Sequence, residues 1–136
     1  MTTPVIPDKA EILALVEMAL VWDLKGSHLP SVEVALDMVE QFTVFGRAVA
    51  DDLRTGCLSI PADSEAGIEI SAQATLGEAT RRLYLSPPRA TQEVASHRAQ
   101  NIARLVRRLL EATEAVRQEL ERAARQTPQH AITKGI

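Results

Sequence analysis

The chain has 136 residues, of which 46% are hydrophobic, 24% are charged and only 3% are aromatic, and its formal net charge is −3. This length fits one domain with an aliphatic core, while the scarce rings and the negative charge argue against a protein that binds nucleic acid. The single cysteine excludes an intrachain disulfide and argues against a thiolate metal site.

The first predicted helix covers residues 9–25, with Asp8 as its N-terminal cap and Gly26 as its stop. Between residues 12 and 24 only Glu17 and Asp23 are polar. A helix that is apolar nearly all round is buried on more than one side. We therefore expect it to be either the central helix of the domain or part of a subunit interface.

This apolar helix is too short to cross a membrane, so we expect no membrane association. The first eight residues lack the basic start and the small-residue cleavage site of a secretory signal, which predicts a cytoplasmic protein.

The second predicted helix begins at Ser31, after a proline, and ends before Gly56. Its apolar positions alternate in steps of four and three residues, which is typical of a helix-packing seam. Gly46 falls inside that seam and predicts the close approach of a neighbouring helix. The seam consists of Val32, Leu36, Val39, Thr43, Gly46, Ala50 and Leu53.

A loop over residues 56–66 separates this helix from a third, which continues to about residue 85, where a Pro-Pro pair follows. The fourth helix is predicted from Thr91 to about Gln126, with a seam that continues through Val116, Leu120 and Ala123. We expect these last turns to lie beyond the reach of the second helix. The sequence thus predicts an all-α four-helix bundle with a long C-terminal helix, in one domain over 1–126, and a disordered tail over 127–136.

Two groups of residues are candidates for a ligand site. Polar side chains near the facing sides of the third and fourth helices could bind an anionic group, and large apolar side chains could line a pocket between helices. Alternatively, the first group is an ordinary ion pair with surface neighbours, and the second is simply core. The polar group is Glu78, Arg82, Arg98 and Asn101, and the apolar group is Trp22, Phe42 and Phe45.

No catalytic constellation, phosphate loop or metal site is evident. The three histidines, His28, His97 and His130, are far apart, so we expect neither a metal nor another cofactor. Arg104, Arg107 and Arg108 could form a basic face on the fourth helix, which would resemble a DNA-reading helix. The alternative is that they pair with the acidic first and second helices.

Two stretches of the chain resemble a family of small actinomycete helical proteins. They are Ala-Thr-Leu-Gly-Glu-Ala-Thr-Arg-Arg-Leu at 74–83 and Arg-Ala-Gln-Asn-Ile-Ala-Arg-Leu-Val-Arg-Arg-Leu-Leu at 98–110, and residues 36–53 fit the family's earlier helix. The family has no assigned reaction and carries the label of natural-product biosynthesis protein. The resemblance implies an accessory or regulatory role near a secondary-metabolite pathway.

These observations favour a non-enzymatic interaction or accessory protein that self-associates as a homodimer, with a further protein partner left open. The alternative is a small-molecule-binding bundle, or an enzyme that acts on an apolar intermediate. A cavity of several hundred cubic ångströms with convergent polar groups favours the alternative. A filled core beside an exposed apolar surface favours self-association.

Overall fold

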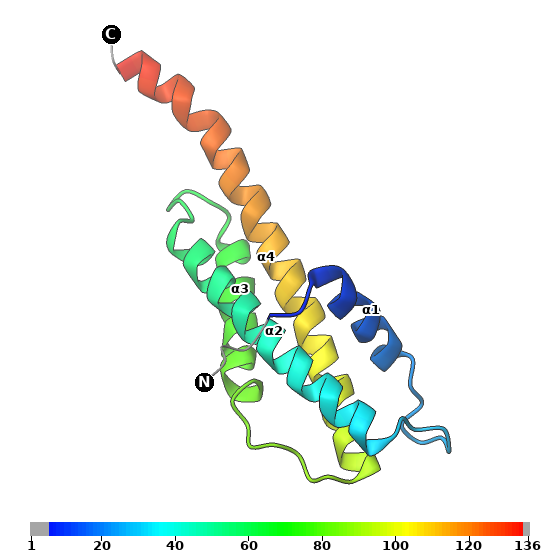
Figure 1. Ribbon diagram of the computed structural model, residues 1–136. Helices are drawn as coiled ribbons and strands as arrows, with labels where there is room; N and C mark the ends of the chain where they lie inside the picture. Colours follow the sequence, from blue (N-terminus) through cyan, green and yellow to red (C-terminus); the bar gives the residue numbers. More distant parts are fainter. Residues whose placement is uncertain (1–5, 135–136) are drawn as a thin grey trace, which may run out of the picture.

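The protein folds into four helices without strands in the part of the chain that the structure describes (Figure 1). The structure is a computed structural model that describes the backbone of residues 6–134 and the side chains of residues 6–126. The predicted all-α bundle with a long C-terminal helix is confirmed. The helices are α1 Lys9–Leu20, α2 Val32–Leu58, α3 Ala66–Arg82 and α4 Gln92–Lys134.

Helix α4 is the centre of the bundle, because it contacts each of the other three helices and packs most extensively against α2. Its seam is fully buried at Ile102, Val106 and Leu109. Helix α1 lies at the side of the bundle, against α4 and to a lesser extent α2 (Figure 1). Of the two placements expected for the first helix, the central one is therefore wrong.

Helix α1 begins where the sequence predicts, since the Asp8 carboxylate accepts a hydrogen bond from the Ala10 amide at 3.2 Å. It ends at Leu20, however, well before the predicted stop at residue 25. The Asp23 carboxylate accepts a hydrogen bond from the Lys25 amide at 3.1 Å. Such a local bond offers the backbone an alternative to the helix, and the chain turns there.

The end of α1 is held by a side chain of α4. The amide nitrogen of buried Gln100 donates to the carbonyls of Ala19 at 2.9 Å and Trp22 at 3.1 Å. Arg104 in turn donates to the Gln100 amide oxygen at 2.7 Å. Carbonyls at a helix end lack partners within the helix, so this contact satisfies groups that burial would otherwise make costly.

Two glycines of α2 allow neighbouring helices to approach closely. A Cβ atom at Gly46 would lie 3.2 Å from a Leu83 methyl and 3.6 Å from a Val106 methyl, which confirms the predicted close approach. A Cβ atom at Gly56 would lie 3.1 Å from Val116. Gly56 was predicted to end the helix, but it lies inside α2, because its missing side chain makes room for α4.

The longer α2 also changes the expectation for the last turns of α4. Val116 is buried against α2, and Leu120 packs on the core of the same chain, so these two seam residues are not beyond the reach of α2. The backbone of α4 continues to Lys134, where a disordered tail was predicted from residue 127. A proline such as Pro128 removes one helical hydrogen bond but does not forbid helical turns on either side.

The loop between α2 and α3 packs against α4 near Glu119. This carboxylate is buried and receives two hydrogen bonds from Arg122, each 2.7 Å long. That contact, together with the nearby Ser64 hydroxyl, lowers the pKa of Glu119 to about 2. The charged Glu119 is therefore a stabilising element at this end of the bundle.

We predict opposite effects for substitutions at two helical glycines. A Cβ atom at Gly77 of α3 meets no atom within 4 Å, so Gly77→Ala should stabilise the protein by about 0.5–1 kcal/mol through helix propensity. Gly46→Val should destabilise it by about 1–3 kcal/mol, because Leu83 and Val106 leave no room. Urea denaturation measures both, and equal shifts of the same sign would contradict the close packing at Gly46.

We also predict an acid-dependent contribution from Glu119. Its pKa is lowered on folding from an ordinary 4.5 to about 2, so its stabilisation is fully present above pH 4.5 and is lost as the pH falls through 2. Glu119→Gln should lower the free energy of unfolding at pH 6 and show a smaller further loss between pH 4.5 and 2 than the wild type does. Glu111→Gln, at an exposed position of the same helix, serves as the control.

Candidate binding site

The site is built around the segment that connects α3 to α4, residues 83–91, called the linker below. It starts where Leu83 ends α3, and the buried Leu83 side chain lies over Gly46. Pro87 and Pro88 follow, and their rings prevent a helical continuation. In the described part of the chain, the linker has no neighbouring strand with which to exchange backbone hydrogen bonds, so side chains must hold it in place.

Two arginines from different helices bind linker carbonyls. Arg47 of α2 donates to the Leu83 carbonyl from Nε at 2.9 Å and from Nη2 at 2.6 Å, and its guanidinium lies 4.3 Å from the centre of the Tyr84 ring. Arg98 of α4 donates from Nη1 to the Ser86 carbonyl at 3.0 Å. Together they fix the course of the linker over α2 and α4.

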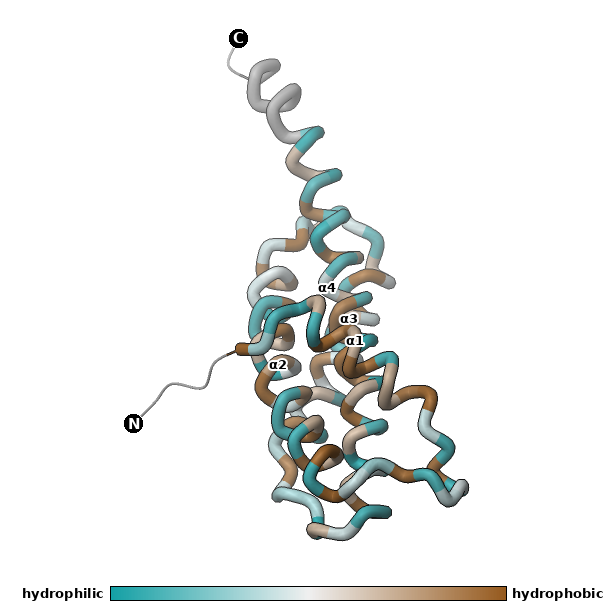
Figure 2. Tube along the Cα trace, turned by 45° about the vertical axis from the view of Figure 1, so that its right-hand side comes forward, coloured by the Kyte–Doolittle hydropathy of each residue, from teal (hydrophilic) through white to brown (hydrophobic). Residues whose placement is uncertain are grey.

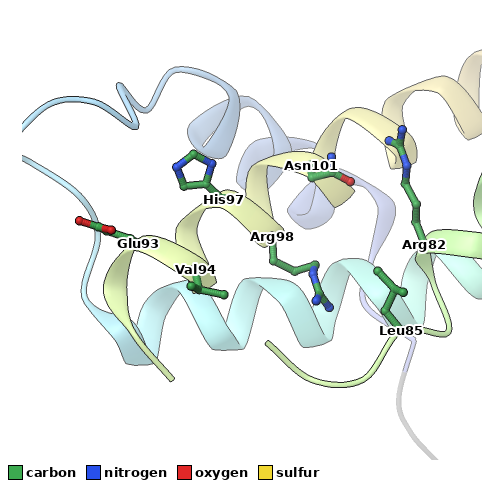
Figure 3. A pocket seen from close by; sticks show the side chains of 7 residues that line it. All are labelled: Arg82, Leu85, Glu93, Val94, His97, Arg98 and Asn101. Carbon is green, nitrogen blue, oxygen red and sulfur yellow. The ribbon is translucent and has the colours of Figure 1, made fainter. Parts of the chain in front are cut away.

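Two open cavities lie on either side of this arrangement. The first has a volume of about 580 Å³, between the end of α3, the linker and the start of α4 (Figure 3). The second, of about 530 Å³, lies between α2, the linker and α4. Arg82, Leu85 and Arg98 line both, so the two cavities meet at these three side chains.

The arginines of the site differ in how their charge is balanced. Arg82 pairs with Glu78 at 3.0 Å, and Arg81 pairs with the same carboxylate. The hydrogen bond from Arg81, followed by the charges of neighbouring arginines, lowers the pKa of Glu78. Arg98 makes no ion pair with any residue that the structure describes, which leaves a half-buried cation without a counter-charge.

The structure brings the predicted polar group together and leaves the predicted apolar group elsewhere. Arg82, Arg98 and Asn101 line the first cavity, and Glu78 joins them through its ion pair with Arg82 (Figure 3). Phe42 and Phe45 are buried in the core, whereas Trp22 is half-buried at its edge. None of these aromatic residues lines either cavity.

Arg47 is the residue of the site that sequence reasoning missed. The sequence does contain one indication of its role, because this arginine follows Gly46 in the middle of a helix that buries two faces. A cation at such a position needs a partner, and here the partner is the Leu83 carbonyl at the end of α3, which has no partner within that helix. The other end of the linker region is held by Gln92, which donates to the carbonyls of Leu29 and Pro30.

The basic residues farther along α4 are engaged within the chain. Arg107 pairs with Glu17 of α1 at 3.2 Å, and Arg104 binds Gln100, so two residues of the predicted basic face contact neighbours rather than project freely. Burial raises the pKa of the Cys57 thiol, which keeps it protonated and a weak nucleophile. Within the described residues, no cluster of three acidic, histidine or cysteine side chains could hold a metal ion.

A second exposed feature is the outer face of α1, formed by Ala10, Ala14, Met18 and Val21. Met18 is 50% exposed and Val21 is 79% exposed, although both are large and apolar. Hydrophobic residues follow one another along α1 and into the turn after it (Figure 2). None of the helices in the described part of the chain has the length and apolar character needed to span a bilayer.

Comparison of the chain with protein-family models, with curated proteins and with solved structures finds no match. The site must therefore be interpreted from its own geometry.

We predict that Arg47 stabilises the linker through its two-pronged contact. Arg47→Ala should destabilise the protein by about 1–3 kcal/mol, because the Leu83 carbonyl loses both charged donors. Arg47→Lys should recover only part of that loss, since an ammonium cannot reproduce the fork of two N–H groups. Denaturant unfolding measures the stability, and full recovery by lysine would show that charge alone matters.

Proposed function

We propose that the protein is a non-enzymatic helical accessory protein that self-associates as a homodimer through the outer face of α1. The observation that carries this proposal is the exposure of Met18 and Val21 on a helix at the side of the bundle. Contiguous apolar surface on a folded protein is typical of interaction sites. The filled core beneath α1, with Ile12, Val16 and Ala19 fully buried, leaves this face available for a partner.

A second copy of the chain fits this face because the face is complementary to itself. Its N-terminal half presents the small side chains of Ala10 and Ala14, and its C-terminal half presents the large ones of Met18 and Val21. In an antiparallel pair centred on Ala14, each Met18 faces the Ala10 of the other copy, and each Val21 faces Pro7. A two-fold axis creates such pairing, and two-fold dimers are the commonest closed assemblies.

The C-terminal end of α4 offers less apolar surface to a second copy than its seam predicts. Val116 and Leu120 contact their own chain, and hydrophilic residues dominate the described turns beyond them (Figure 2). The interface that we propose is therefore centred on α1. The resemblance of residues 74–83 and 98–110 implies an accessory role in natural-product biosynthesis. We include this role in the proposal, because it is compatible with a self-associating protein.

We expect the wild-type protein to have a dimer mass by light scattering at micromolar concentrations. Met18→Asp should convert it to a monomer, because the carboxylate of each copy would be buried against Ala10 of the other copy without a polar partner. The side chain is half exposed in the single chain, so the fold should survive, with unchanged helical circular dichroism.

Ile70→Asp is the matched control, since Ile70 is 67% exposed on α3, outside the proposed face. It should leave the dimer intact. A monomer mass for the wild-type protein, or a dimer that persists in the Met18→Asp variant, would rule out this interface.

A further inference from the structure

The first feature of the cavities that indicates a ligand site is the charge of Arg98. A guanidinium has five N–H donors, and only one of those of Arg98 has a partner in the described part of the chain, at the Ser86 carbonyl. The side chain is half-buried and lines both cavities. A cation that is partly withdrawn from water and has no counter-charge attracts an anion more strongly than one at an open surface.

Arg98 is oriented by contacts within the chain that do not need a ligand. Its contact with Ser86 joins it to the linker, and the linker is held at Leu83 by Arg47. Figure 3 shows the Arg98 side chain extending from α4 toward Leu85. A side chain that already has a contact in its binding orientation loses less conformational entropy when a ligand binds, which favours recognition.

The second cavity provides apolar surface beside this cation. Its volume of about 530 Å³ lies within the range of small-molecule sites, and its walls come from α2, α4 and the linker prolines. The apolar residues along it are Leu36, Val39, Val44, Leu83, Leu85, Pro87, Pro88 and Ile102.

Acidic residues limit the charge of the ligand. Glu93 lines the first cavity and Glu40 lines the second. Each would repel a second negative charge placed beside it. Arg47 also lines the second cavity, but its guanidinium is engaged by the Leu83 carbonyl and the Tyr84 ring. The charge of Arg82 is already offset by Glu78, so it adds less attraction than Arg98 does.

From these features we propose that the two cavities form one site for a small amphipathic monoanion, with its carboxylate at Arg98 and its apolar chain along the second cavity. A short-chain or medium-chain acyl carboxylate has this chemistry. The site is separate from the outer face of α1, and the inference does not depend on self-association.

Calorimetric titration of the full chain with octanoate tests the site directly. Three comparison ligands test the features of octanoate one at a time. Acetate lacks the apolar chain, 1-octanol lacks the charge, and octanedioate carries a second charge. We expect octanoate to bind at least about tenfold more tightly than each of them, because a charge-assisted hydrogen bond and apolar burial are each worth about one such factor or more. Equal affinity for octanoate and 1-octanol would overturn the proposed role of Arg98.

Variants locate the ligand. Arg98→Gln should weaken octanoate binding at least about tenfold, whereas Arg125→Gln, at an exposed position of the same helix, should not change it. Arg98→Gln also removes the contact with Ser86 and could therefore displace the linker. A second pair of variants, at Leu85, leaves this contact in place. Leu85 is 53% exposed and lines both cavities, so Leu85→Glu and Leu85→Gln should both fold and differ only in charge.

We expect Leu85→Glu to abolish octanoate binding and Leu85→Gln to retain most of it. Equal binding by these two variants, or no octanoate binding by the wild-type protein, would overturn the proposal. The Met18→Asp variant should bind octanoate like the wild type, which separates failure of this site from failure of the proposed dimer.

Discussion

The close contact between α2 and α4 determines where everything else in this protein can lie. Two glycines on α2 keep its neighbours close, because a Cβ atom at Gly56 would lie 3.1 Å from Val116 of α4, and one at Gly46 would lie 3.2 Å from Leu83 at the end of α3. Helix α4 supplies the facing seam and also carries α1 and α3 on its other sides. A helix that contacts all the others acts as the scaffold of the bundle, so the surplus length of α4 extends from a rigid base (Figure 1).

The contact at Gly46 explains why the linker becomes a candidate site. Leu83 fills the space above Gly46, and this anchors the end of α3 beside Arg47. A segment with two prolines cannot form a continuous set of backbone hydrogen bonds, so its carbonyls need other donors. Arginines from α2 and α4 provide them, at Leu83 and Ser86. Cations that serve a structural purpose are thereby concentrated next to open cavities. Neither Arg47 nor Arg98 pairs with a carboxylate in the described part of the chain, but Arg47 commits two N–H groups to the Leu83 carbonyl, whereas Arg98 commits only one, to Ser86.

Local signals in the sequence predict much of the fold, and the errors come from contacts between distant residues. Asp8 and Ser31 cap their helices through bonds that span two or three residues, so the chain nearby is sufficient to predict them. Gly56 has the same local signature as a helix stop, yet it is kept in α2 by Val116, sixty residues further along the chain. The ion pair between Glu78 and Arg82 follows from helical spacing. Arg47, by contrast, joins the site only because α3 ends beside it.

The two proposed surfaces are connected through α4, because α1 packs on this helix and Arg98 of the cavity site belongs to it. Near its start, Gln100 binds carbonyls at the end of α1, and Gln92 binds carbonyls just before α2. Arg98 and Asn101 border the first cavity. Sharing a helix does not by itself couple two sites, because coupling requires an element with two arrangements that both ligands favour unequally. The buried seam of α4 holds it in one arrangement, since a close-packed core resists small displacements. A ligand at Arg98 that leaves α4 in place has no differential affinity for the monomer or the dimer. Binding and self-association should therefore be independent, and the bundle can serve as a fixed frame on which both occur.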